Sequence, residues 1–152
     1  MSALSEQIAN VTIDRETAAR MLNAGWEFDW SLSVGASVQK VGYLVGDQLQ
    51  GLVQFERVPE SLFNFIYLIE AAPWNRGRRK AVDGVVGVLF ATVAQDSLDA
   101  GFDGFVAFKS KTVLKDHYVK KYGAKVLFDD QLFFDTAASL KLIADYLGGD
   151  DG

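Results

Sequence analysis

The feature that most constrains the fold is a segment in which a short apolar strand, a long apolar helix and a second short strand follow one another. Residues 62–69 read LFNFIYLI, a run with few polar positions, which predicts a central strand covered on both faces. Apolar residues then recur at helical spacing over 81–100, and Gly101 ends the pattern. Residues 104–108 (GFVAF) form the next strand. Such a unit predicts two parallel strands joined by a right-handed crossover.

The flanking sequence supplies the rest of a sheet and its covering helices. Asp14 is placed to cap a helix and Gly25 to end it. No linker or repeat interrupts the chain, so we expect one α/β (α+β) domain over 1–147, with a mixed sheet flanked by helices, and a disordered tail over 148–152. The other predicted elements are helices over 15–24, 112–122 and 136–147, and strands over 26–34, 41–45, 49–58, 125–128 and 131–134.

Composition narrows the classes of function. The chain has 152 residues, no cysteine and a single histidine, His117, which argues against disulfides, thiolate chemistry and multi-ligand sites, so we expect no metal. The net charge of −5 disfavours binding to nucleic acid. No apolar run has the length of a membrane span and no secretion signal is visible, so we expect a cytoplasmic protein with no membrane partner.

Four basic residues stand within five positions just before the long helix. A compact group of cations in an acidic chain suggests a local anion site, although a solvated surface loop explains it equally well. Gly84 and Gly87 follow in the first turns of the helix, where glycine is less favourable than alanine by roughly 1 kcal/mol. Either a phosphate-bearing ligand approaches the bare backbone there or the helix packs closely on the sheet, and the adjacent cations favour the ligand. The basic residues are Arg76, Arg78, Arg79 and Lys80.

Motifs on both sides of the long helix match those of a known family. Pro73, Arg76 and Gly77 form a Pro-x-x-Arg-Gly turn after a strand, and residues 117–128 read HYVKKYGAKVLF. Over 41–134 the chain thereby resembles the GCN5-related N-acetyltransferase (GNAT) superfamily. The resemblance implies a single mixed sheet with a β-α-β core that binds acetyl-CoA as a co-substrate.

The resemblance also implies where the coenzyme is held. In the family, a loop with the pattern Arg/Gln-x-x-Gly-x-Gly/Ala binds the diphosphate, but the expected glycine positions hold Arg79 and Ala81 here. We therefore expect an expanded loop whose cradle lies later, at the start of the helix, with Lys111 near the pantetheine arm. The residues expected to bind the coenzyme are Ala71, Ala72, Arg79, Lys80, Gly84, Val85, Val86, Gly87 and Lys111.

Catalytic roles follow from the same resemblance. Tyr118 matches the tyrosine that protonates the leaving thiolate, although it also fits as an ordinary aromatic residue of an amphipathic helix. A backbone N–H near Ala71 or Ala72, where the strand splays, would stabilise the oxyanion of the thioester carbonyl. Glu70 is the first choice for the base that deprotonates the acceptor amine, and Glu56 is the second.

The function implied is direct transfer of an acetyl group from acetyl-CoA to an amine. The first 60 residues carry more acids than bases, which favours a cationic acceptor, either a small molecule or a peptide. Many members of the family pair, so a homodimer is expected. Two alternatives stay open, namely a non-catalytic acyl-CoA-binding or regulatory protein on the same fold, and an interaction protein that binds neither substrate.

Overall fold

The computed structural model describes residues 5–77 and 80–148. The strands are β1 (Glu6–Asn10), β2 (Gln39–Val45), β3 (Gln48–Val58), β4 (Phe63–Ala71), β5 (Val106–Lys109), β6 (Lys125–Phe128) and β7 (Gln131–Phe134). The helices are α1 (Arg15–Asn23), α2 (Val85–Asp99), α3 (Lys115–Tyr122) and α4 (Thr136–Ile143), with 3-10 turns at Pro73–Asn75 and Thr112–Leu114 and a π-helical turn at Ala144–Gly148. None of the helices described is long and apolar enough to cross a membrane.

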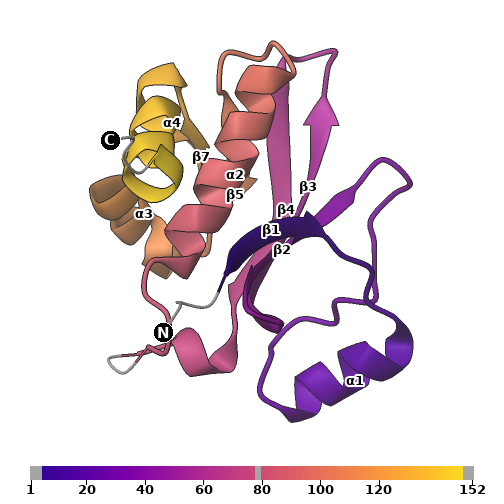
Figure 1. The fold of residues 1–152 in the computed structure, drawn as a ribbon. Helices are drawn as coiled ribbons and strands as arrows, with labels where there is room; N and C mark the ends of the chain where they lie inside the picture. The colour runs from indigo at the N-terminus through magenta and orange to yellow at the C-terminus, as the bar shows by residue number, and fades with distance from the viewer. Residues whose placement is uncertain (1–4, 78–79, 149–152) are drawn as a thin grey trace.

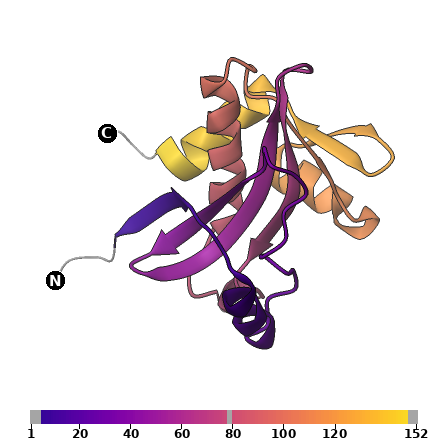
Figure 2. The ribbon, with the colours of Figure 1, turned by 90° about the vertical axis from the view of Figure 1, so that its right-hand side faces the viewer.

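The strands form one mixed sheet in the order β1-β2-β3-β4-β5-β7-β6, and of the strand pairs that the structure describes only β4 and β5 are parallel. Figure 1 shows α2 along one face of the sheet with α4 beside it, whereas α1 lies apart from both. Figure 2 shows β1 and the β6–β7 hairpin at opposite ends of the sheet. The predicted single domain and β-α-β unit are therefore confirmed.

The main core lies between the sheet and α2. Phe90, in the middle of α2, is fully buried, and its ring centroid lies 4.9 to 5.9 Å from those of four other aromatic residues. Because the sheet packs on one side of α2 and α4 on another, the helix is apolar nearly all round. The four aromatic neighbours of Phe90 are Phe108, Tyr118, Tyr122 and Phe134.

A second, smaller core covers part of the opposite face. Neighbouring residues of a strand point to opposite faces, and Val53 belongs to the main core while Leu52 belongs to the second. Leu52 packs there with Met21 of α1 and with Trp30 of the segment that follows α1. Among the described residues, α1 and the segment 24–38 thus cover part of the face opposite α2.

The caps and hairpins agree with the sequence. Asp14 accepts a hydrogen bond from the Thr17 amide at 2.8 Å, and Asp135 accepts one from the Ala138 amide at 2.9 Å, so each carboxylate begins a helix as predicted. Gly123, with φ of 79°, ends α3 in the left-handed conformation that glycine favours.

Segment 26–34 is not the predicted strand. Trp26 and Trp30 are buried, but the backbone turns after Asp29, whose carboxylate accepts hydrogen bonds from the Ser31 amide at 3.0 Å and the Ser31 hydroxyl at 2.6 Å. The first strand of the sheet is instead β1. Its sequence, EQIAN, is polar and almost wholly exposed, so it lacks the hydrophobic alternation by which a half-buried strand is recognised.

The start of α2 also differs from the prediction, which placed it at residue 81. The Ala81 and Val82 amides bond to the preceding turn, and Gly84 has φ of 75°, which lies outside helical backbone, so α2 begins at Val85. β4 is central as predicted, but Tyr67 on it is 37% exposed, so the strand is not covered on both faces.

The predicted tail begins too early. Gly148 ends the π-helical turn, and the remainder of that tail, 149–152, lies outside the described residues.

Gly51→Ala should destabilise the protein, because α2 packs directly on β3 at this residue. An added Cβ would lie 3.0 Å from the Glu70 carbonyl oxygen and 3.1 Å from a methyl carbon of Leu89. We expect a loss of about 1–3 kcal/mol in the free energy of unfolding, measured by chemical denaturation. Gly35→Ala, whose Cβ would meet only Val38 at 3.9 Å, should leave stability unchanged, and equal stability of the two variants would contradict the close packing.

Candidate functional site

The parallel ladder between β4 and β5 stops well before β4 does. Its three residue pairs end at Ile66 and Phe108, whereas β4 continues to Ala71. Gln54 of β3 pairs with Leu68 and the next residue pairs with Ile66, so Tyr67 is the extra residue of a β-bulge. The bulge and the ending of the ladder leave the second half of β4 without a strand partner on its β5 side.

The backbone of Ala71 faces this split, whereas that of Ala72 does not. The Ala72 amide donates to the Gln50 carbonyl at 2.9 Å, so it points toward β3. Peptide groups alternate in direction along a strand, which turns the N–H of Ala71 toward the β5 side. Of the two predicted oxyanion donors, Ala72 is therefore wrong, because its amide is already engaged.

Glu70 is buried and fully engaged. Its side chain is 6% exposed and accepts hydrogen bonds from the Glu27 amide at 2.6 Å, the Phe28 amide at 3.3 Å and the Trp30 indole at 2.8 Å, and it forms an ion pair with Arg76. Four donors match the roughly four acceptor positions of a carboxylate. The geometry gives Glu70 a structural role, and the base assignment gains no support from it.

The basic cluster divides between two environments. Arg76 turns inward to Glu70, and its guanidinium also donates to the Ala71 carbonyl at 3.1 Å and lies 3.5 Å from the Glu27 carboxylate. Lys80 is exposed, and its ammonium lies 3.8 Å from the Asp83 carboxylate. The predicted binding residue Arg79, together with Arg78, lies outside the described residues. Arg76 thus fixes the end of β4 through these contacts, and its guanidinium is not part of an anion site.

A buried polar network holds the loop that leads into α2. Gln50 accepts hydrogen bonds at its side-chain oxygen from the Trp74 indole at 3.1 Å and the Asn75 amide group at 2.8 Å. Asn75 in turn accepts one from the Val82 amide at 2.7 Å. Gln50 and Asn75 were not predicted, because the strand also carries Gln54, Glu56 and Arg57 and its pattern does not distinguish Gln50 as a buried polar contact.

Gly84 and Gly87, at the start of α2, are glycine for different physical reasons. Gly84 caps α2 in the left-handed conformation and offers no side chain to the first amides of the helix. Gly87 is packed, because an added Cβ would overlap the ring of Tyr146, which lies in the π-helical turn. The cradle predicted at Gly84–Gly87 is therefore covered at Gly87, and close packing explains that residue. Val85 is buried and Val86 half-buried, so only the end of α2 is open to a ligand.

The hollow beside the start of α2 does not suit phosphate. It has a volume of about 410 Å³ and is lined by Gly84, Tyr146 and the carboxylates of Glu6 and Asp83. Two carboxylates repel an anion, so this side of the helix is an unfavourable approach for a diphosphate. An anion would reach the amides along the axis of α2, from the loop side.

Tyr118 lies next to the point where β4 and β5 separate. Its ring centroid is 5.4 Å from that of Phe108, which is in the last residue pair of the parallel ladder, and 5.9 Å from that of Phe90. Burial raises the pKa of Tyr118 above its usual value, so its hydroxyl is protonated at neutral pH. Lys111 and His117 are exposed. The location suits a proton donor at the split. The packing also fits the alternative that Tyr118 is an ordinary aromatic residue of the core.

Glu70→Gln should reduce stability, because an NH₂ group would face donors that now meet an oxygen. We expect a loss of about 3 kcal/mol in the free energy of unfolding, measured by denaturation with tryptophan fluorescence. Glu56→Gln, at a more exposed carboxylate, should change stability little. A Glu70→Gln protein of normal stability would instead contradict the structural role of this carboxylate.

The effect of Gly87→Ala on stability should change sign when the Tyr146 ring is removed. In the wild-type background it destabilises, because the clash with the rigid Tyr146 ring outweighs the roughly 1 kcal/mol that alanine gains in a helix. In a Tyr146→Ala background the same substitution should stabilise by up to about 1 kcal/mol. Thermal or chemical denaturation of the four proteins measures the difference, and an equal effect in both backgrounds would contradict the contact.

Comparison with known proteins places the fold. No family model matches the chain, and neither does any curated protein sequence. A Desulfovibrio desulfuricans protein assigned to the GNAT family of acetyltransferases aligns with 87% of this chain and 99% of its own, with a TM-score of 0.62 and 13% identity. A Bacillus subtilis acetyltransferase in complex with CoA aligns with 86% of this chain and 99% of its own, with a TM-score of 0.59 and 12% identity. An IAA acetyltransferase from Bacillus cereus aligns with 82% of this chain and 79% of its own, with a TM-score of 0.56 and 15% identity. The chain therefore has the fold of the GNAT superfamily, as its motifs predicted.

Proposed function

We propose that the protein transfers an acetyl group from acetyl-CoA to an amine at the split between β4 and β5. One observation carries the proposal: the parallel ladder ends at Ile66 and Phe108, while β4 continues past a bulge to Ala71. This arrangement leaves the Ala71 amide turned toward the split, where a thioester carbonyl could accept its hydrogen bond. The likeness in fold to CoA-dependent acetyltransferases supports the same reading.

The residues around the split are suited to two parts of such a reaction. The amine nitrogen would attack the thioester carbonyl carbon, the C–S bond would break, and the sulfur would leave as a thiolate that needs a proton. The Ala71 amide would stabilise the negative charge on the carbonyl oxygen, a contribution typically of about 3 kcal/mol. The Tyr118 hydroxyl would supply the proton to the thiolate.

The start of α2 is the place for the diphosphate of the coenzyme. Gly84 provides no capping side chain, so the amides of Val85, Val86 and Gly87 lack a side-chain acceptor from the cap residue. These amides and the positive end of the helix dipole favour an anion. Lys80 adds a positive charge to the loop that precedes them, and Tyr146 limits the approach to the end of the helix.

Glu56 is the better candidate for the base. It is only half-buried and accepts a hydrogen bond from Tyr67, the bulge residue. That hydrogen bond raises the pKa of Tyr67 and so keeps its hydroxyl protonated and donating. A carboxylate here would attract a cationic amine, either a small molecule or a peptide, and accept its proton directly or through water.

A second candidate function is binding of acyl-CoA without transfer. Two observations favour it: the engagement of Glu70 by four donors and the packing of Tyr146 on Gly87. The two functions differ in whether free CoA is released when an amine is present.

Tyr118→Phe should separate these functions. For an acetyltransferase we expect acetyl-CoA to bind both proteins, as measured by calorimetry, and kcat for CoA release to fall about 10²–10⁴-fold in the variant. Tyr122→Phe is the matched control, because Tyr122 is a buried aromatic one turn later on α3 and should retain full activity.

The pH profile provides a second readout. A proton donor must be protonated, and the pKa of Tyr118 is raised, so its deprotonation should not lower the wild-type rate until pH exceeds about 10.

Binding of acetyl-CoA without release of CoA in the presence of any of a panel of amines would favour the non-catalytic function. Absence of binding at millimolar acetyl-CoA would overturn both.

A further inference from the structure

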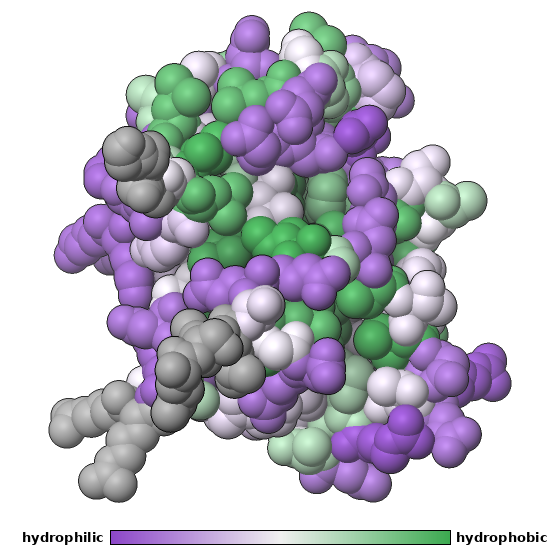
Figure 3. Space-filling model, viewed as in Figure 1, coloured by the Kyte–Doolittle hydropathy of each residue, from purple (hydrophilic) through white to green (hydrophobic). Residues whose placement is uncertain are grey.

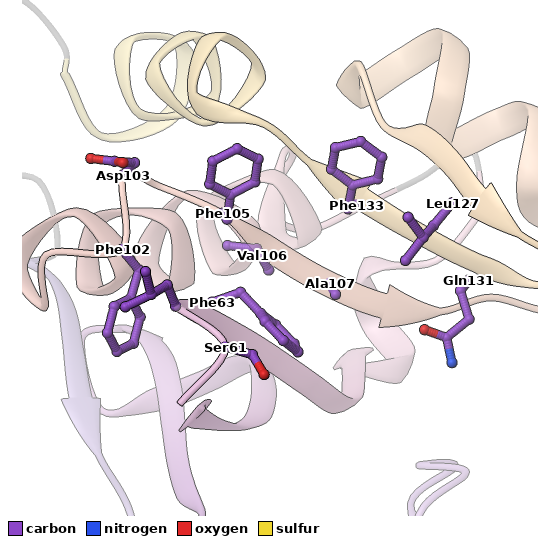
Figure 4. A pocket seen from close by; sticks show the side chains of 11 residues that line it. Ser61, Phe63, Phe102, Asp103, Phe105, Val106, Ala107, Leu127, Gln131 and Phe133 are labelled. Carbon is purple, nitrogen blue, oxygen red and sulfur yellow. The ribbon is translucent and has the colours of Figure 1, made fainter. Parts of the chain in front are cut away.

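One half of the sheet has an uncovered aromatic face on the side opposite α2. On β5, Val106 and Phe108 point to the main core, so Phe105 and Ala107 point the other way. Phe133 of β7 pairs with Ala107 and shares that direction. Figure 4 shows the side chains of this face, which we call the open face and define as Phe63, Phe105, Ala107, Leu127 and Phe133.

The open face is hollowed and strongly apolar. The hollow has a volume of about 430 Å³, and Leu62, Phe105 and Leu127 at its walls are 59%, 37% and 53% exposed. Leu62 adopts φ of 60°, a conformation that a bulky residue rarely takes. Exposed apolar residues gathered into one patch are typical of an interaction surface.

Most of this surface lies toward the end of β4 opposite the Ala71 amide. Phe63 and Ala71 are the first and last residues of β4, and a rise of about 3.3 Å per residue puts them roughly 26 Å apart. The part of the open face nearest to the split is Ala107, which precedes Phe108 at the end of the parallel ladder. The rest of the hollow extends away from the split toward the start of β4.

The sheet edge at this end of the molecule is not suited to pairing with another strand. β6, the edge strand, carries Lys125 and a bulge between Val126 and Phe128, both of which hinder strand addition. A partner would therefore meet the face of the sheet and not extend its edge.

Opposite charges flank the open face at the two ends of β5. Asp103 precedes the strand and lies on the wall of the hollow, and Lys109 ends the strand on the same face as Phe105 and Ala107. Both side chains are exposed, and neither has an ion pair within the part of the chain that the structure describes. An apolar centre between one acid and one base is complementary to a copy of itself turned end for end.

We propose that the open face packs on the open face of a second copy, about a two-fold axis perpendicular to β5. In this arrangement the two β5 strands run antiparallel across the interface, with Asp103 opposite Lys109 of the partner subunit, twice by symmetry. The aromatic side chains meet between the two ion pairs, as in face-to-face sheet packing.

A charge-swap experiment tests this arrangement. Asp103→Lys and Lys109→Asp each replace two attractive contacts by two repulsive ones, so each should raise the dimer dissociation constant about tenfold or more, measured by sedimentation equilibrium. An equimolar mixture of the two single variants should form a heterodimer, and the double variant should pair with itself, because both restore opposite charges across the interface.

Two controls keep the result decisive. Leu140→Glu alters an exposed leucine of α4, a helix that packs on α2 on the other side of the sheet, and should leave the dimer intact. Figure 3 views the molecule from that side and shows apolar residues among polar ones there. Lys109→Asp lies in regular strand, whereas Asp103 has φ of 58°, so circular dichroism must show that Asp103→Lys is folded. A monomeric wild-type protein at the highest concentration measured would overturn the proposal. So would a dimer that neither single variant weakens, or failure of the mixture to recover pairing.

Discussion

The buried carboxylate of Glu70 is the interaction on which the geometry of the site depends. It joins three segments that are distant in sequence: the end of β4, the coil that follows α1, and the turn that carries Arg76. A buried charge is tolerated only where donors and a counter-charge replace water, and here both do. By holding Arg76 at the Ala71 carbonyl, the carboxylate also fixes the direction of the last peptide groups of β4.

The parts of the fold that follow from local physics could be predicted. The apolar run of β4, the periodicity of α2 and the caps Asp14 and Asp135 each depend on neighbours within a few residues. Hence the β-α-β unit, the hairpins and the helix ends matched the structure within a few residues. β1 was not predicted, because a short, exposed edge strand needs no apolar alternation.

The site could be predicted only in part, because its decisive contacts join distant residues. Gly87 is glycine on account of Tyr146, and no local pattern distinguishes that reason from an approaching phosphate. Glu70 has the position expected of a base, but its partners at 27, 28 and 30 come from a segment for which the sequence pattern predicts a strand. The resemblance selected Tyr118, whose ring lies beside Phe108 because helix and strand there follow one another directly, and its role as proton donor stays a prediction.

The brevity of the parallel ladder has a mechanical consequence. Within the described residues, three residue pairs form the ladder that joins the β1–β4 plate of the sheet to the β5–β7–β6 plate, so little main-chain bonding resists rotation of one plate against the other. Stiffness along that line comes from side chains instead, chiefly from α2, which bridges both plates through Phe90 and through Leu89. The two plates are thus joined by a short backbone ladder, and α2 packs across both and limits how far they can separate.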